Sequence, residues 1–324
     1  MPDTSCSKHL PRPARYFPVT GGRYSARAGL FRFPTDFGNG IADHQVFQFD
    51  ADFYHNRDNK LAVRKQALGE YVCFTDDAED SLVQVTQFII EQLGRHYPGV
   101  FRLEDTGTNL HLHCLLSGTE IVARKDYALV SSSNPSGAAE PLNLFDALAL
   151  ELQEDLCVMQ VGPAASQLCA AHLCAPNHWA ASDKLGMAMP ALHTPVPGFT
   201  ELNRSPDKLL TGIINKQQPY VRFAWGISAD RCYNHHPRLS DAQNACDDDD
   251  GIYMRIERQL LYPMPDNRTL LFTIKTLFRD CAEIKRDSPE EFIQLVQAIN
   301  TMGNATLVYK GFDRDEVLMQ LNAI

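Results

Sequence analysis

Arg258 has the clearest reason to take part in chemistry, because it stands in the apolar row of a predicted strand. Residues 253–276 read as two strands joined by a Pro-Asp-Asn turn. Strand alternation puts Arg258 on one face with Met254, Ile256 and Leu260, and puts Gln259 on the other face. Burying a guanidinium is costly unless an anion or a full set of acceptors meets it. We therefore expect Arg258 to meet an anion, either Glu154 or Asp155 of this chain or a ligand.

His193 is the second candidate, because the sequence Thr-Pro-Val-Pro follows it directly. Each proline fixes its own φ and holds the residue before it extended, so this segment has little conformational freedom. A histidine beside it is presented at low entropic cost, as an axial metal ligand or a catalytic base must be. An ordinary surface or core histidine is the alternative.

Two further groups contain residues that can bind metals. His111 and His113 share one face of a predicted strand at residues 109–116, a spacing that two metal ligands can use. No third ligand lies near them in the sequence, so a polar face of an edge strand is the favoured interpretation. Cys169, His172, Cys174 and His178 could form a zinc site. Alternation turns Cys169 away from the others, which favours an apolar strand instead.

The composition is typical of a soluble globular protein that does not bind nucleic acid. The chain has 324 residues, 44% hydrophobic and 22% charged, and a formal net charge of −10. A nucleic-acid footprint would need a basic surface. The nine cysteines form no CxxC pair, and neither a membrane span nor a signal peptide is recognisable. These features predict a cytoplasmic protein. Phosphate loops, nucleophile elbows and zinc-protease helices are absent from the sequence.

The chain order predicts the α+β class with an antiparallel sheet. Residues 1–25 read as an N-terminal tail, followed by a single domain over residues 26–324. Helices are expected over residues 81–93 and 143–153, and a hairpin across the Gly162-Pro163 turn. Residues 176–206 read as an irregular loop, and residues 229–251 as a solvated insertion. A capping box at Ser288-Pro289-Glu290-Glu291 predicts a last helix that ends before Gly303.

Several strings of residues, taken together, resemble the haem-dependent oxidative N-demethylase alpha-subunit family, also called the HRQ family. The strings are Gln153-Glu154-Asp155-Leu156, Cys174-Ala175-Pro176-Asn177-His178-Trp179, Lys184-Leu185-Gly186, Leu192-His193-Thr194-Pro195-Val196-Pro197, Glu257-Arg258-Gln259 and Phe272-Thr273-Ile274-Lys275-Thr276. Their order and spacing agree over residues 29–312, which is nearly the whole chain.

The resemblance implies a PAS-like antiparallel β-sheet core, over roughly residues 145–280, elaborated with N- and C-terminal helices and holding haem b. It implies an oxygenase subunit that uses dioxygen to oxidise a small methylated amine such as dimethylamine, with release of formaldehyde. Electrons would come from NADPH through separate flavin and iron–sulfur reductase components. The chain has no nucleotide-binding fingerprint and no iron–sulfur cysteine spacing, so the resemblance implies the haem subunit alone.

The resemblance also suggests roles for individual residues. His193 would be the axial ligand of the haem iron, with His178 in reserve. Arg258 would gain a haem propionate as its anion. The resemblance does not identify the catalytic residues.

Three more residues are expected to contact the cofactor. Trp179 would pack on the macrocycle, and Gln259 would lie at the pocket rim on the other strand face. Arg222 is the third residue expected to contact the cofactor. The chain departs from the family where Ala224 stands in place of the asparagine of an Arg-x-Asn-Trp string. A different amine specificity, or lost activity, could follow. A PAS-like haem or small-molecule sensor without turnover is the alternative function, and a haem-free protein whose Arg258 pairs with a carboxylate is a third.

Overall fold

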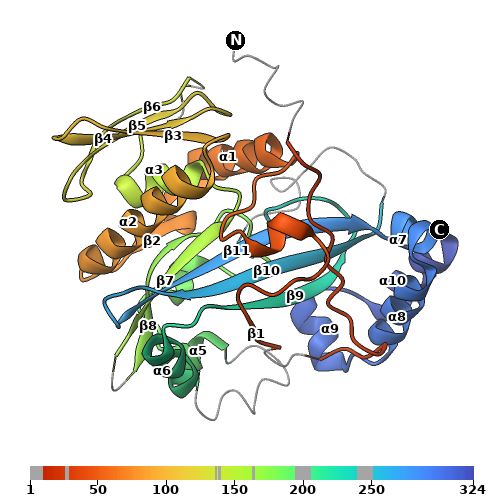
Figure 1. Cartoon of the computed structure of the whole chain (residues 1–324). Coiled ribbons are helices and arrows are strands. Elements are labelled where there is room, and N and C mark those ends of the chain that lie inside the picture. Colours follow the sequence, from red (N-terminus) through yellow and green to blue (C-terminus); the bar gives the residue numbers. More distant parts are fainter. Residues whose placement is uncertain are drawn as a thin grey trace.

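A computed structural model shows two antiparallel sheets and the helices that cover them (Figure 1). It describes residues 10–25, 29–135, 137, 140–162, 165–193, 206–238 and 251–324, and only the backbone of His193 and Pro206. The fold is α+β, as the sequence predicts.

The large sheet has seven strands in the order β1-β9-β10-β11-β7-β8-β2, and every pair is antiparallel. Its strands are β1 (Phe31–Arg32), β2 (Val72–Phe74), β7 (Asp155–Val161), β8 (Ser166–His172), β9 (Tyr220–Ser228), β10 (Tyr253–Pro263) and β11 (Thr269–Asp280). Both predicted hairpins, β7–β8 and β10–β11, are confirmed. The register of β7 against β8 shifts between Val158 and Met159. Val158 pairs with Ala170 and Met159 with Leu168, so Cys169 has no partner residue on β7. Leu168 and Ala170 therefore belong to different apolar clusters, although simple alternation predicts that they share a face.

The small sheet has four strands and lies outside the helices α2 and α3 (Figure 1). Its strands are β3 (Phe101–Asp105), β4 (Asn109–Cys114), β5 (Glu120–Arg124) and β6 (Leu129–Ser133). β4 confirms the strand expected around His111 and His113.

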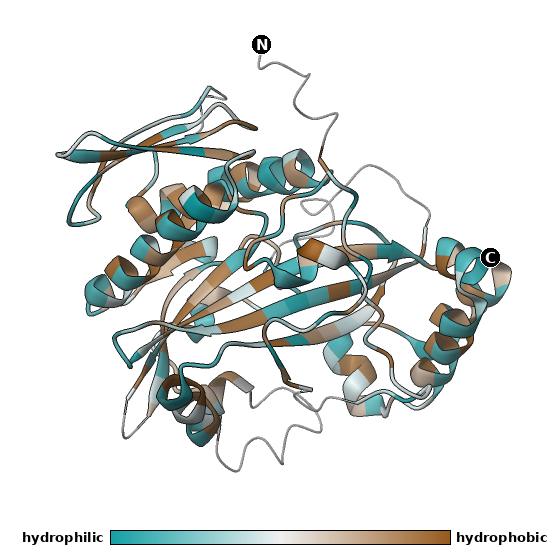
Figure 2. Cartoon of the chain, in the orientation of Figure 1, coloured by the Kyte–Doolittle hydropathy of each residue, from teal (hydrophilic) through white to brown (hydrophobic). Residues whose placement is uncertain are grey.

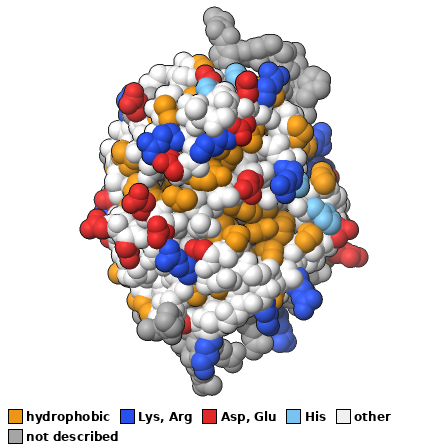
Figure 3. All heavy atoms as spheres, turned by 60° about the vertical axis from the view of Figure 1, so that its left-hand side comes forward, with side chains coloured by type: hydrophobic (Ala, Val, Ile, Leu, Met, Phe, Trp, Pro, Cys, Tyr) orange, Lys and Arg blue, Asp and Glu red, His pale blue; other side chains and the backbone are white. Residues whose placement is uncertain are grey.

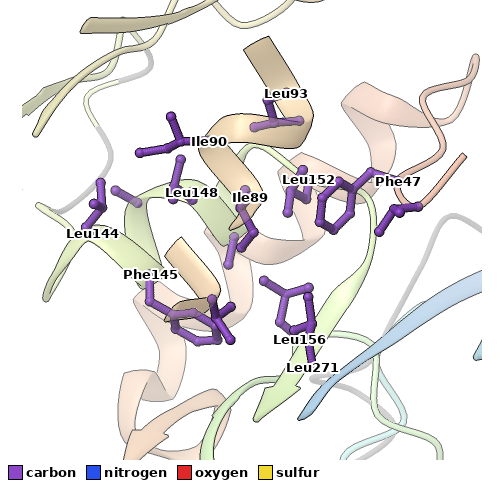
Figure 4. Close-up of a cluster of buried hydrophobic side chains, with 14 of the residues drawn as sticks. Phe47, Ile89, Ile90, Leu93, Leu144, Phe145, Leu148, Leu152, Leu156 and Leu271 are labelled. Atoms are coloured by element: carbon purple, nitrogen blue, oxygen red, sulfur yellow. The ribbon is translucent and has the colours of Figure 1, made fainter. Parts of the chain in front are cut away.

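Helices cover one face of the large sheet and form the main core with it. They are α1 (Phe53–Tyr71), α2 (Glu79–His96) and α3 (Leu144–Leu150), preceded by the short helix η2 (Gly40–His44). In α2, Val85, Ile89 and Leu93 recur at the spacing of one helical face and are fully buried. They pack with side chains of α3 and β7, as Figure 4 shows for Leu148 and Leu156. The helix predicted over residues 81–93 is thus confirmed, and it extends to His96.

The remaining helices lie elsewhere on the large sheet. They are α4 (Ala181–Lys184), α5 (Met189–His193), α6 (Pro206–Lys216), α7 (Cys281–Asp287), α8 (Pro289–Asn300), α9 (Asn304–Lys310) and α10 (Arg314–Ala323). Side chains of α5 and α6 belong to the apolar cluster of the second sheet face. Helices α7–α10 gather at one end of the sheet (Figure 1). Hydrophobic and hydrophilic residues are mixed along strands and helices, as amphipathic elements require (Figure 2).

Buried ion pairs join α1 to the segment that contains α3 and the start of β7. Arg57 binds Glu151 at 2.8 Å, Arg64 binds Asp146, and the Lys60 ammonium lies 3.9 Å from Asp155. Lys60 is fully buried and also donates to three backbone carbonyls, so all three donors of its ammonium are used. These groups tie the helix layer to the sheet, and removing one partner would strand a buried charge.

Three segments differ from their predictions. Residues 10–25 are no free tail, since Tyr16 and Val19 are buried in the cluster around α8. The region from 176 to 206, predicted as irregular, contains α4, α5 and the start of α6. Within the predicted solvated insertion, the described residues 229–238 include a buried Tyr233 and pair with the chain near Asn177. In each case long-range packing orders a stretch that lacks a local periodic pattern.

The last predicted helix is present as α8, with Pro289 in its first turn. Ser288 is its N-cap residue, but the Ser288 side chain makes no capping hydrogen bond, so that half of the predicted capping box is wrong. The helix predicted over residues 143–153 is shorter, and Asn143 caps it by accepting from the Asp146 N–H.

The surface in Figure 3 carries charged side chains of both signs around hydrophobic groups that gather near its centre. That face therefore has no field of a single sign. Among the helices in the described ranges, none combines the length and apolar character needed to cross a membrane.

Candidate functional site

A cavity of about 560 Å³ lies on the face of the large sheet that α1–α3 do not cover. Its floor comes from β7, β9, β10 and β11, and its cover comes from α5, α6 and the segment around α4. Tyr24 and residues of α9 close one end. Segments from the N-terminal and C-terminal parts of the chain therefore meet at this cavity.

One end of the cavity is apolar. The floor there is formed by Cys157, Met159, Leu261, Leu270, Phe272 and Ile274, and the cover by Met189, Leu192, Leu209 and Leu210. β-Alternation explains the floor, because these strand residues are direct neighbours across the paired strands, as in Leu261 opposite Phe272. This end suits a large apolar group.

The other end of the cavity is polar, and four side chains on two paired strands make its floor. Arg222 lies opposite Gln259, and Ala224 lies opposite Glu257. The Gln259 amide donates to a Glu257 carboxylate oxygen at 2.8 Å. Two buried atoms here, Nε of Arg222 and Oε1 of Gln259, have no hydrogen-bond partner among the described residues. Unpartnered buried polar atoms at a cavity are available to a bound ligand or an ordered water.

Lys310 reaches this polar end from the C-terminus of α9. Its Nζ donates to the Trp225 carbonyl at 2.5 Å and lies 5.5 Å from the centroid of the Tyr24 ring. Burial lowers the pKa of Lys310 to about 8, against the opposing effect of Glu257 and with the help of Arg222. Nothing in the sequence signals this placement, since Lys310 is more than forty positions from the end of β10.

His178 lies at the cavity rim and is held by a neighbouring loop. It has a φ of +61° and donates its backbone N–H to the His235 carbonyl at 3.0 Å. The two imidazoles stack with centroids 5.5 Å apart. A non-glycine residue at positive φ persists only where its surroundings hold it.

Fixed hydrogen bonds hold His235 in turn. An Nη1–H of Arg255 points at its Nδ1 at 3.3 Å, and its Nε2 lies 3.0 Å from Asp230. Because the guanidinium can only donate, Nδ1 is the acceptor and Nε2 carries the proton. Partial desolvation lowers the pKa of His178, and His235 and Arg255 lower it further. His178 is therefore neutral near pH 7, as a metal-binding imidazole must be.

Four of the predicted site residues line this cavity, namely His178, Trp179, Arg222 and Gln259. His193 ends α5, and Met189 and Leu192 of that helix also line the cavity. The side chain of His193 and the Pro195–Pro197 segment lie outside the described residues, so its axial role stays a prediction.

Arg258 lies on the opposite face of the sheet, away from the cavity. It is buried, and it donates to the carbonyls of Gln45 at 2.8 Å and Val46 at 3.4 Å. Neither expected carboxylate pairs with it directly, since Glu154 accepts from the Gln48 N–H instead. The structure thus gives Arg258 backbone acceptors where the resemblance implies a propionate.

The four residues of the predicted zinc site do not come together as one cluster. Cys169 donates to the Val158 carbonyl and takes no part in a cluster. His172 and Cys174 do meet, 3.7 Å apart, with Asp155 beside them and no exposed surface. Lys60 is the cation that already faces Asp155. His111 lies instead against Glu120, at 3.2 Å on the small sheet.

A second group of three potential ligands, Asp230, Cys232 and His235, also offers no ready metal site. Cys232 is disulfide-bonded and has no thiolate to offer. In the described part of the chain, the cavity is therefore the better candidate site.

The fold and the site define an α+β protein with a cavity that is apolar at one end and charged at the other. Residues 39–318 match the family model described as haem-dependent oxidative N-demethylase, alpha subunit-like. The chain belongs to this family. The resemblance stated from the sequence motifs is thereby confirmed, and the family's description names haem dependence and oxidative N-demethylation.

Proposed function

We propose that this chain is the haem-binding oxygenase subunit of an oxidative N-demethylase, and that strands β7–β11 are its PAS-like core. These five strands are consecutive in the chain and adjacent in the sheet, between residues 155 and 280. The observation that carries the proposal is the two-ended cavity above them, in a member of a family described as haem-dependent.

The residues present fit a haem. The cavity volume of about 560 Å³ falls within the range of cofactor sites, roughly 300–1,000 Å³. The apolar floor would carry the macrocycle, with Trp179 packed against it. Arg222, whose Nε is unpartnered, would meet a propionate with a planar pair of donors. His193 remains the first choice as axial ligand, with His178, neutral and at the rim, as the reserve.

When bound, the haem would supply the iron at which dioxygen is activated with two electrons from the reductase, so that an N-methyl group is hydroxylated and leaves as formaldehyde. The protein residues would bind and orient the amine. Glu257 is the carboxylate of the cavity floor, and it would accept hydrogen bonds from the substrate ammonium. Gln259 holds that carboxylate at 2.8 Å and so fixes its direction. The two electrons would come from NADPH through separate flavin and iron–sulfur components.

The test starts with the absorption spectrum of the protein reconstituted with haem. We expect a Soret band that shifts with a dioxygen surrogate such as carbon monoxide. His193→Ala should weaken or shift it, and His178→Ala should do so only if His178 is the ligand. His113→Ala is the matched control, because His113 is an exposed histidine of the small sheet. A protein that binds no haem would overturn the proposal.

Turnover is tested with dimethylamine, an external electron donor and a formaldehyde assay. Glu257→Gln keeps the shape but removes the charge, so we expect it to raise KM for the ammonium substrate at least about ten-fold. Haem binding without formaldehyde release, across a panel of methylated amines, would favour the sensor over the enzyme.

A further inference from the structure

Glu257 and Lys310 carry opposite charges at the polar end of the cavity, and they attract each other without forming a direct ion pair. Glu257 accepts one hydrogen bond from Gln259. Lys310 uses one of its three donors on the Trp225 carbonyl. Among the residues that the structure describes, neither forms an ion pair. Glu257 acts on Lys310 only at a distance, so a ligand anion in direct contact would stabilise the partly buried ammonium further.

The sheet register places these two charges on either side of a small residue. Ala224 lies directly opposite Glu257, which sets their Cβ atoms about 4.5–5.5 Å apart. Gly226, two residues further along β9, lies beneath the Lys310 ammonium, since a Cβ at Gly226 would be 3.7 Å from Nζ. Two residues of a strand span about 6.6 Å. The space above Ala224 is therefore bounded by Glu257 on one side, with Lys310 towards one end and Arg222 towards the other.

We propose that this subsite binds its substrate as a zwitterion, an N-methylated α-amino acid whose ammonium meets Glu257 and whose carboxylate meets Lys310. The proposal rests on the proposed N-demethylase function and names its substrate class. In an α-amino acid the two charged groups are separated by a single carbon, so one small molecule could present its ammonium to Glu257 and its carboxylate towards Lys310. A simple methylammonium ion would satisfy Glu257 and leave Lys310 without an anion.

The reaction balances with dioxygen as oxidant and a two-electron reductant. One oxygen atom enters a C–H bond of the N-methyl group, and the other leaves as water with two protons and two electrons. The resulting carbinolamine loses formaldehyde when its C–N bond breaks, and the nitrogen keeps the electron pair and a proton. The demethylated amino acid is the second product.

The decisive experiment compares substrates that differ only in the carboxylate. N-methylglycine is matched with N-methylethylamine, and both are titrated into the haem-loaded protein by difference spectroscopy and into the haem-free protein by calorimetry. Wild-type protein should bind N-methylglycine about ten-fold or more tightly than N-methylethylamine. Lys310→Met should remove this preference, and Lys310→Arg should restore most of it. Lys216→Met is the control, an exposed lysine at the end of α6 outside the cavity lining.

Other results would overturn the proposal. Equal affinity of the two compounds for wild-type protein would do so, and so would a preference that survives in Lys310→Met. If Lys310→Met instead loses haem while the substrate preference stays, Lys310 is a propionate partner. Failure of the proposed function is a different result, because it is the absence of a Soret band, and the calorimetric comparison does not depend on haem.

Discussion

Arg258→Met tests whether this buried arginine supports the fold or the cofactor. The substitution keeps an unbranched stem and removes the guanidinium from a site that is 1% exposed. The Gln45 carbonyl, 2.8 Å from Nη2, would lose its donor, and so would the more distant Val46 carbonyl. An unsatisfied buried acceptor costs about 1–3 kcal/mol, and breaking a buried charged contact costs at most about 3–5 kcal/mol. We therefore expect the free energy of unfolding to fall by about 2–4 kcal/mol.

The assay is urea denaturation of the haem-free protein, followed by haem titration of the folded variant. Arg32→Met is the control for stability, because Arg32 is exposed on β1. Arg222→Met is the control for haem affinity. We expect Arg258→Met to be unstable but to bind haem normally, and Arg222→Met to show the reverse. A stable Arg258→Met protein that fails to retain haem would refute the reasoning and restore the propionate role.

Three further predictions concern the cavity end and one helix. The pKa of Lys310, about 8, lies below its unfolded value of about 10.4, so the unfolded state binds more protons between these values and the free energy of unfolding should rise with pH there. Lys310→Met should remove that slope, at most about 1.4 kcal/mol per pH unit, in denaturation curves from pH 7.5 to 10. Gly311→Ala should lower stability by about 1–2 kcal/mol and disturb His178, because φ is +73° and the new Cβ would be 3.0 Å from the imidazole; thermal unfolding and the Soret band check both effects. Asn143→Ala should cost about 1 kcal/mol by removing the acceptor of the Asp146 N–H, and an unchanged denaturation midpoint would contradict the cap.

Several polar and charged groups surround Lys310, whose pKa is lowered. They are Glu257 on β10, Arg222 on β9, Tyr24 of the N-terminal segment, Tyr309 beside it on α9, and His178 at the rim. Glu257 is the one of these groups whose charge favours the protonated ammonium. A bound carboxylate would add a second favourable partner, so N-methylglycine should raise the pKa of Lys310. The slope of stability between pH 8 and 10 would then shrink when that ligand is present.

In residues 253–276, local pattern was enough to determine the strands and their faces. Alternation in residues 253–276 gave the β10–β11 hairpin and put Arg258 and Gln259 on opposite sides, as the structure has them. Side-chain direction in a strand depends only on the neighbouring residues, so this information is present in the sequence. The family motifs likewise identified the family and brought four cavity residues to attention.

Only the tertiary structure decided which face of the sheet carries the cavity. The segment from Gln45 to Gln48 covers the Arg258 face, and it comes from more than two hundred positions earlier in the chain. The same applies to Tyr24 and Lys310, which close the cavity from the two ends of the chain. Such contacts depend on how distant segments fold together, and no periodic pattern in the sequence encodes them. The sequence alone could therefore mark Arg258 as buried and in need of acceptors, but only the fold could supply backbone carbonyls to it and leave Arg222 facing the cavity.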